Sequence, residues 1–119
     1  MAMRMIIAGG RNYVFTQFDY DVLDLIHLRF GVSEVVSGKA RGADTSGEVW
    51  AAARSIPVAG FPADWDALGR PAGHIRNAQM AEYADAVVLF PGGKGTDSMA
   101  KLALNNSLRI WDFRGVNND

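Results

Sequence analysis

Short apolar runs alternate with longer amphipathic stretches along the chain. Ile, Val and Leu dominate the short runs, which is the pattern of strands buried on both faces of a sheet. They cover about 3–9, 33–37, 57–61, 85–90 and 108–112. Between them, apolar residues recur every three or four positions, which predicts helices. These cover about 17–29, 44–54, 72–83 and 97–106.

The alternation of strands and helices predicts an α/β fold. Parallel strands joined by helices need right-handed crossovers, which place helices on both faces of the sheet. We therefore predict a Rossmann-like three-layer α/β/α sandwich with a five-stranded parallel sheet of order 3-2-1-4-5, the commonest doubly wound half. No repeat or linker interrupts the pattern, so 1–119 is interpreted as a single domain, with 113–119 as a frayed tail.

The spacing of apolar residues also predicts which helix faces are buried. In the first helix, Thr16 is the expected N-cap. The residues expected to face the core are Phe18, Val22, Leu25 and Ile26 in the first helix, Val49, Ala52 and Ala53 in the second, and Met99, Leu102 and Ala103 in the last.

Composition and charge exclude several classes of protein. The net charge is −1, which gives no bulk attraction to nucleic acid or to a membrane surface. No apolar run approaches the ~20 residues that span a bilayer, and residues 1–10 are too short and too soon interrupted for a signal peptide. There is no cysteine and only two histidines, so no metal site is expected. A cytoplasmic protein that requires no cofactor is the resulting expectation.

Glycines and basic residues gather where the predicted strands end. In an open parallel sheet, ligands bind beyond the carboxyl ends of the strands. The segments that follow the first four strands are 9–12, 37–44, 62–66 and 91–96. Six of the twelve basic residues lie in or near these segments: Arg11, Lys39, Arg41, Arg70, Arg76 and Lys94. This distribution predicts a site for a phosphorylated small molecule.

Segment 91–96, Pro-Gly-Gly-Lys-Gly-Thr, carries the strongest signal. A buried strand that runs into a glycine loop and then a helix presents free N–H groups and the helix dipole to an anion. Glycine also allows the backbone to approach a phosphate closely. Neither Gly-x-Gly-x-x-Gly after the first strand nor a Gly-Lys-Ser/Thr ending is present, so neither a dinucleotide-binding dehydrogenase nor a P-loop ATPase is predicted.

Five segments together resemble the SLOG superfamily, the Rossmann-like domains related to the lonely-guy and lysine decarboxylase-like proteins. More narrowly, they resemble a small bacterial and phage family of unknown function within it. The segments are 9–11, 37–44, 61–65, 73–80 and 90–96. The resemblance implies a pocket for a nucleotide or nucleotide derivative, with 91–96 around a phosphate, and a possible homo-oligomer, dimer or tetramer. The residues expected at the ligand are Gly9, Gly10, Arg11, Ser37, Gly38, Lys39, Arg41, Gly42, Asp44, Trp65, Arg76, Asn77, Pro91, Gly92, Gly93, Lys94, Gly95 and Thr96.

The lonely-guy enzymes hydrolyse the N-glycosidic bond of nucleoside monophosphates, and their signature can be compared residue by residue. It has an arginine-lysine pair before a methionine, then Pro-Gly-Gly-x-Gly-Thr-x-x-Glu. Arg76 and Met80 match, but Asn77 replaces the lysine and Met99 stands at the catalytic glutamate. Methionine cannot replace a carboxylate in stabilising an oxocarbenium-like transition state. We therefore expect this activity to be lost, and assign no catalytic residue. If the protein is an enzyme, the candidates are Asp44, Asp64, Asp66 and Arg76.

Three functions remain open. Binding of a nucleotide-derived ligand, for sensing or sequestration, is preferred; a nucleotide hydrolase or transferase that uses an aspartate is the alternative, and a non-catalytic interaction module is the third. Single residues also have two interpretations. Trp65 either covers the core or stacks on a base, Arg76 either binds ligand or pairs with Glu82 or Asp85, and Lys39 and Lys94 are either solvated or in contact with ligand.

Overall fold

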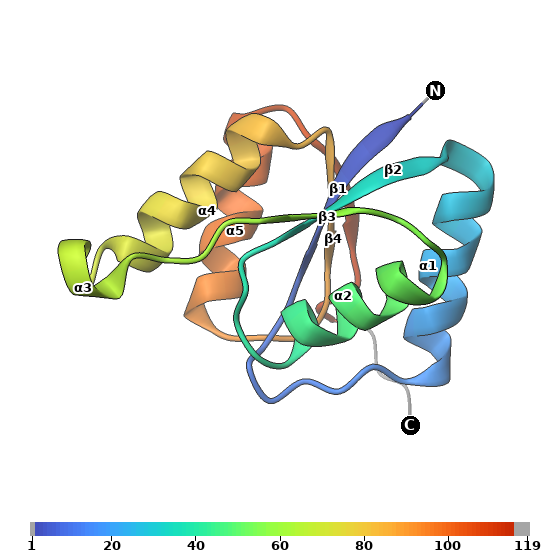
Figure 1. Cartoon of the computed structure of the whole chain (residues 1–119), viewed down its shortest axis with the longest axis horizontal. Coiled ribbons are helices and arrows are strands. Elements are labelled where there is room, and N and C mark those ends of the chain that lie inside the picture. Colours follow the sequence, from blue (N-terminus) through green and yellow to red (C-terminus); the bar gives the residue numbers. More distant parts are fainter. Residues whose placement is uncertain (1, 116–119) are drawn as a thin grey trace.

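The computed structural model describes residues 2–115 and contains a five-stranded, wholly parallel sheet (Figure 1). The strand order is β3-β2-β1-β4-β5, as the sequence predicted. The strands are β1 Met3–Ala8, β2 Val32–Ser37, β3 Val58–Gly60, β4 Ala86–Leu89 and β5 Arg109–Asp112. In the centre of the sheet, Met5 of β1 lies in register between Val35 of β2 and Ala86 of β4.

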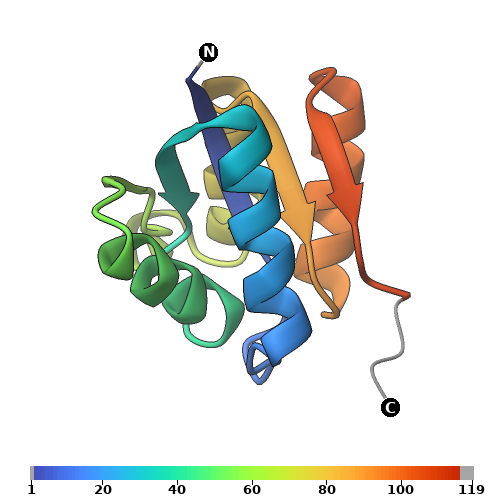
Figure 2. The same cartoon turned by 90° about the vertical axis from the view of Figure 1, so that its right-hand side faces the viewer.

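Helices cover both faces of the sheet, as Figure 2 shows. Helices α1 (Gln17–Phe30) and α2 (Ala43–Ala53) lie on one face, and α4 (Ala72–Tyr83) and α5 (Lys94–Asn105) lie on the other. Successive strand residues point to opposite faces, so Met5 packs in the cluster with Leu23 of α1, whereas Ile6 packs with Met80 of α4 and Met99 of α5. The predicted three-layer α/β/α sandwich is therefore confirmed.

Helix α1 buries only part of the predicted stripe: Ile26 is buried and Val22 packs against the core cluster. Asp19, Leu23 and Ile26 are buried, whereas Phe18 and Leu25 are 42% and 54% exposed. Asp19 faces inward because its carboxylate accepts hydrogen bonds from the Tyr13 hydroxyl (2.6 Å) and the Thr16 N–H (2.9 Å). The predicted Thr16 cap is present and forms a capping box with Asp19.

Helix α2 also differs from its predicted register. Val49 is 59% exposed, and Ala52 and Ala53 are exposed as well. The helix instead buries Trp50, its largest apolar side chain, and Gly47, where an added Cβ would lie 3.1 Å from the Ile7 side chain. The missing side chain lets α2 approach β1 closely, and this contact sets the rotation of the helix.

Two features lie outside the sequence prediction. A short helix, α3 (Trp65–Leu68), stands in the connection between β3 and α4, with the Asp64 carboxylate accepting from the Ala67 N–H (3.1 Å). Helix α5 begins at Lys94 instead of Asp97, which places Gly95 and Thr96 in its first turn. Along α5, Met99 and Ala103 are buried as expected, whereas Leu102 is half-buried.

Part of the predicted frayed tail is held in place. The Phe113 N–H donates to the Leu89 carbonyl (2.8 Å), and Arg114 pairs with Asp97 and Asp112 at 2.8 Å each. Positions 116–119 lie outside the described residues. Over 2–115, no helix is long and apolar enough to cross a bilayer.

Candidate functional site

The loops after three strands are tied together at Gly10. Its N–H donates to the Pro91 carbonyl (2.9 Å), and its carbonyl accepts from the Ala43 N–H (3.1 Å) at the start of α2. Gly42, with a φ of +79°, lies so close that an added Cβ would be 2.3 Å from the Gly10 carbonyl oxygen. An added Cβ on Gly92 would be 2.8 Å from the Gly10 nitrogen. Gly42 and Gly92 are therefore required by the packing of these loops against Gly10.

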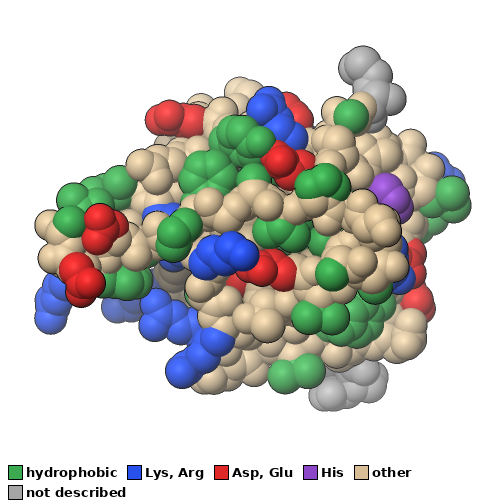
Figure 3. All heavy atoms as spheres, viewed as in Figure 1, with side chains coloured by type: hydrophobic (Ala, Val, Ile, Leu, Met, Phe, Trp, Pro, Cys, Tyr) green, Lys and Arg blue, Asp and Glu red, His purple; other side chains and the backbone are tan. Residues whose placement is uncertain are grey.

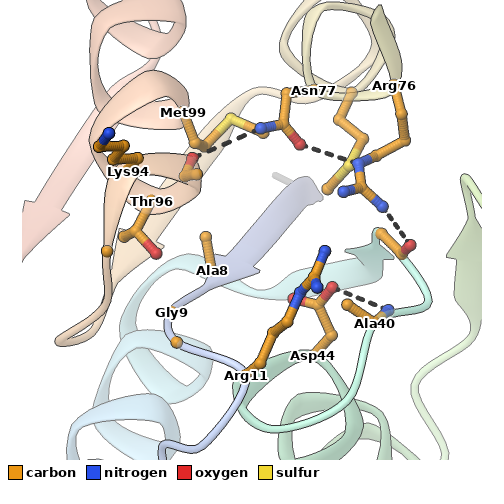
Figure 4. A pocket seen from close by; sticks show the side chains of 15 residues that line it. Ala8, Gly9, Arg11, Ala40, Asp44, Arg76, Asn77, Lys94, Thr96 and Met99 are labelled. Carbon is orange, nitrogen blue, oxygen red and sulfur yellow. Dashed lines mark hydrogen bonds between the residues drawn. The ribbon is translucent and has the colours of Figure 1, made fainter. Parts of the chain in front are cut away.

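A cavity of about 370 Å³ opens at this edge of the sheet. Figure 4 shows Arg11, Asp44 and Arg76 on one side of it and Lys94 and Thr96 on the other. The lining residues are Ala8, Gly9, Gly10, Arg11, Gly38, Ala40, Asp44, Arg76, Asn77, Met80, Gly93, Lys94, Gly95, Thr96 and Met99. The cavity thus joins the β1, β2 and β4 loops with helices α4 and α5.

One wall of the cavity is the N-terminus of α5. No side chain caps this end at Gly93, whereas Thr16 caps α1. The first N–H groups of a helix have no intrahelical partner, so they remain available to an anion. Gly93 and Gly95 both have negative φ, and an added Cβ at either position would meet nothing within 4 Å. The fold therefore does not require glycine at 93 or 95, whereas close approach of a ligand would.

Arg76 forms the opposite wall and is held by backbone and side-chain contacts. Its Nη1 donates to the Gly38 carbonyl, and its Nε donates to the Asn77 Oδ1 (2.9 Å). An added Cβ on Gly38 would lie 2.7 Å from Nη1, so the guanidinium occupies the space of a side chain at 38. Among the described residues Arg76 pairs with neither Glu82 nor Asp85, the two alternatives from the sequence, and Asp85 pairs with Arg4 (3.3 Å).

Asp44 lies among these positive charges. Its carboxylate accepts from the Ala40 N–H (3.2 Å). Burial raises the pKa of Asp44 to about 6, against the opposing effects of Arg76 and Arg11. Burial and the proximity of Arg11 lower the pKa of Arg76, against the effect of Asp44. Within 2–115, neither Arg11 nor Arg76 forms an ion pair. The cavity consequently carries excess positive charge, which suits an anionic ligand.

The remaining predicted residues lie elsewhere. Ser37 is buried and its hydroxyl donates to Glu48 (2.6 Å), while Lys39 pairs with the same carboxylate (2.9 Å). Pro91 and Gly92 border a separate depression with Arg114. Lys39, Arg41 and Trp65 line an adjacent cavity. Asp64, the N-cap of α3, and Asp66, in its first turn, are both exposed.

Four lining residues were not among the predicted ligand contacts. They are Ala8, Ala40, Met80 and Met99. All four are apolar, and nothing in the sequence distinguishes an apolar residue at a ligand site from one in the core. Only the resemblance pointed to Met80 and Met99, because both stand at positions of the lonely-guy signature. Met99 is 2% exposed and borders the cavity, where it offers neither a base nor a charge. Among residues 2–115, no group of carboxylates and histidines could hold a metal ion.

Comparison with known proteins gives the relationships of the chain. The model of the YspA, cpYpsA-related SLOG family matches residues 3–67, from β1 into α3. The Gene 61 protein of Mycobacterium phage D29 is 31% identical over 121 residues, covering 92% of this chain and 95% of that protein. No solved structure gives a significant match. The extent of these two matches shows that the chain belongs to the YspA, cpYpsA-related SLOG family.

Proposed function

We propose that this protein binds a nucleotide or a nucleotide-derived phosphorylated small molecule, which it senses or sequesters. The proposal rests on one observation: two opposite sides of the cavity both suit an anion. The uncapped N-terminus of α5, with Gly93 and Gly95 open to the cavity, faces Arg11 and Arg76, which form no ion pair within 2–115. Membership of a SLOG family supports a nucleotide-related ligand.

The polar and the apolar residues of the cavity suit different parts of such a ligand. A phosphate at the start of α5 would accept charge-assisted hydrogen bonds from backbone N–H groups, each worth roughly 1.5–3 kcal/mol. Arg11 and Arg76 would face the same charge, while Met80 and Met99 offer apolar contact to a sugar or base. At about 370 Å³, the cavity is within the range of about 300–1,000 Å³ typical of small-molecule sites.

A panel experiment tests the proposal. The purified protein is titrated calorimetrically with nucleoside mono-, di- and triphosphates, cyclic nucleotides and dinucleotides, and each mixture is then analysed by mass spectrometry. Saturable binding of an unchanged ligand supports a binding protein. Product formation supports the enzyme, and absence of binding across the panel contradicts the proposal and leaves the interaction module.

Arg76→Ala should weaken binding of any phosphorylated ligand at least tenfold, about 1.4 kcal/mol, because it removes a cation from the cavity wall. Calorimetry checks the effect. Arg4→Ala is the matched control: it removes the same charge near the amino end of β1, where Arg4 pairs with an exposed Asp85. Equal losses of affinity in the two variants would show that only net charge matters, and would contradict a specific contact with Arg76.

A nucleotide hydrolase remains the second candidate because of Asp44. Of the three aspartates considered from the sequence, only Asp44 lines the cavity. A carboxyl whose pKa is raised to about 6 is suited to proton transfer near neutral pH. If the panel yields product, Asp44→Asn should abolish turnover and retain binding. Turnover that survives this substitution would exclude Asp44 as the acid or base.

A further inference from the structure

A second cavity adjoins the first at the carboxyl end of β2. It measures about 420 Å³ and shares Arg11, Gly38, Ala40 and Arg76 with the first cavity. Its other lining residues are Lys39, Arg41, Pro62, Ala63 and Trp65. The Arg76 guanidinium, bonded to the Gly38 carbonyl, therefore stands between the two spaces. Figure 3 shows Lys and Arg side chains gathered around a hollow at this end of the molecule.

The cations of the second cavity are not equivalent. The Lys39 ammonium is neutralised by Glu48 (2.9 Å), and the Lys39 stem lies where a side chain on Gly60 would be, 2.5 Å from an added Cβ. Arg41 is exposed and, like Arg11, forms no ion pair within 2–115. Arg41 is thus the cation that this cavity adds for a second anionic group, and Arg11, which lines both cavities, can face both groups.

Trp65 gives this cavity an aromatic surface. The side chain is 48% exposed, although the ring is seated against α4: an added Cβ on Gly73 would lie 3.1 Å from its Cη2 atom. The Trp65 ring is therefore supported on one side and does not belong to either core cluster. A supported, partly exposed indole can stack on a base without losing much conformational freedom.

We infer that the second cavity is a subsite for the remainder of an extended ligand. This rests on the proposed function, because the first phosphoryl group is the one at α5. A second phosphoryl group would lie between Arg11 and Arg41, and an aromatic base would stack on Trp65, with Arg76 facing the linkage. The ligand class is a nucleotide with two linked phosphoryl groups and a base beyond them, as in a pyrophosphate-linked dinucleotide. A nucleoside monophosphate would fill one cavity only.

The test compares two matched sets of probes. The nucleoside monophosphates and the corresponding pyrophosphate-linked dinucleotides are titrated calorimetrically against the full chain. The best dinucleotide should bind at least tenfold more tightly than its monophosphate. Trp65→Ala and Arg41→Ala should each lower dinucleotide affinity at least tenfold and monophosphate affinity no more than twofold.

Matched variants keep the result interpretable. Trp65→Phe retains an aromatic ring and should keep most of the dinucleotide affinity, even if Trp65→Ala lowers the melting temperature. Arg29→Ala removes an exposed cation from the last turn of α1 and should not change the dinucleotide affinity. If monophosphates bind as tightly as dinucleotides, or if Trp65→Ala weakens both equally, the subsite is wrong while the proposed function stands. If neither set binds, the subsite is wrong, and the proposed function fails only if the other nucleotides of the panel do not bind either.

Discussion

Gly93→Val is expected to lower affinity for a phosphorylated ligand at least a hundredfold, about 2.8 kcal/mol. Gly93 lines the cavity at the N-terminus of α5, and a branched side chain there would occupy the space through which a phosphate approaches the backbone N–H groups. Because an added Cβ at 93 meets nothing within 4 Å, the fold itself should accept the substitution. Valine caps a helix less well than glycine, so stability should fall by no more than about 1 kcal/mol.

The measurement pairs calorimetric titration with urea unfolding of the same variant. Gly115→Val is the control, because position 115 also has open space around an added Cβ but borders a different depression. It should change neither affinity nor stability appreciably. Wild-type affinity in Gly93→Val would show that the ligand does not approach α5, and would remove the main support for the proposed function.

The fold was predictable because the strands are apolar on both faces. Residues such as Met5 and Ile6 pack into opposite clusters, so the sequence shows continuous apolar runs rather than an alternation. Helix rotation was less predictable, because it depends on particular contacts. A buried Asp19 satisfied by Tyr13, and a glycine fitted against Ile7, do not appear in a count of apolar positions. Helix α3 is four residues long, too short to give a periodic signal.

The candidate site shows a similar division. The rule for parallel sheets predicted which edge would hold the glycine loops, and the structure places the cavity there. The sequence could not separate the roles of individual glycines. Gly42 and Gly92 are required by contacts with Gly10, whereas Gly93 and Gly95 face open space. That difference depends on backbone atoms distant in sequence.

The basic residues needed the structure for the same reason. Lys39 and Arg41 are two positions apart and look alike in the sequence. Only the fold brings Glu48 to the Lys39 ammonium and leaves Arg41 without an ion pair among the described residues. Likewise, the bond from Arg76 to the Gly38 carbonyl joins residues 38 positions apart. Charge neutralisation is a tertiary property, so a list of cations overstates the number that can bind an anion.

Asp44→Asn should raise the free energy of unfolding by on the order of 1–2 kcal/mol at pH 7.5 and leave it nearly unchanged at pH 4. The folded-state pKa of Asp44 is about 6, above its ordinary value of 3.8, because burial disfavours the charged form. Between these values the unfolded chain has lost a proton that the folded chain still holds. Stability in the wild type therefore falls as pH rises from about 4 to 6, and it stays lower above that range. Asparagine remains neutral throughout and can still accept from the Ala40 N–H.

The full shift of about two pKa units would correspond to about 3 kcal/mol, with the attraction of Arg76 and Arg11 already included in the pKa. We expect a smaller gain because Asp44 is only partly buried and solvent weakens the effect. Urea unfolding of both proteins at pH 4, 5, 6 and 7.5 isolates Asp44, because the other carboxylates titrate in both. A constant difference across this range, or a variant less stable at pH 7.5, would contradict the raised pKa.

The same linkage extends to the ligand: a bound phosphate adds negative charge near Asp44 and should favour its protonated form. Anion affinity should then fall as pH rises through about 6 in the wild type and change less in Asp44→Asn.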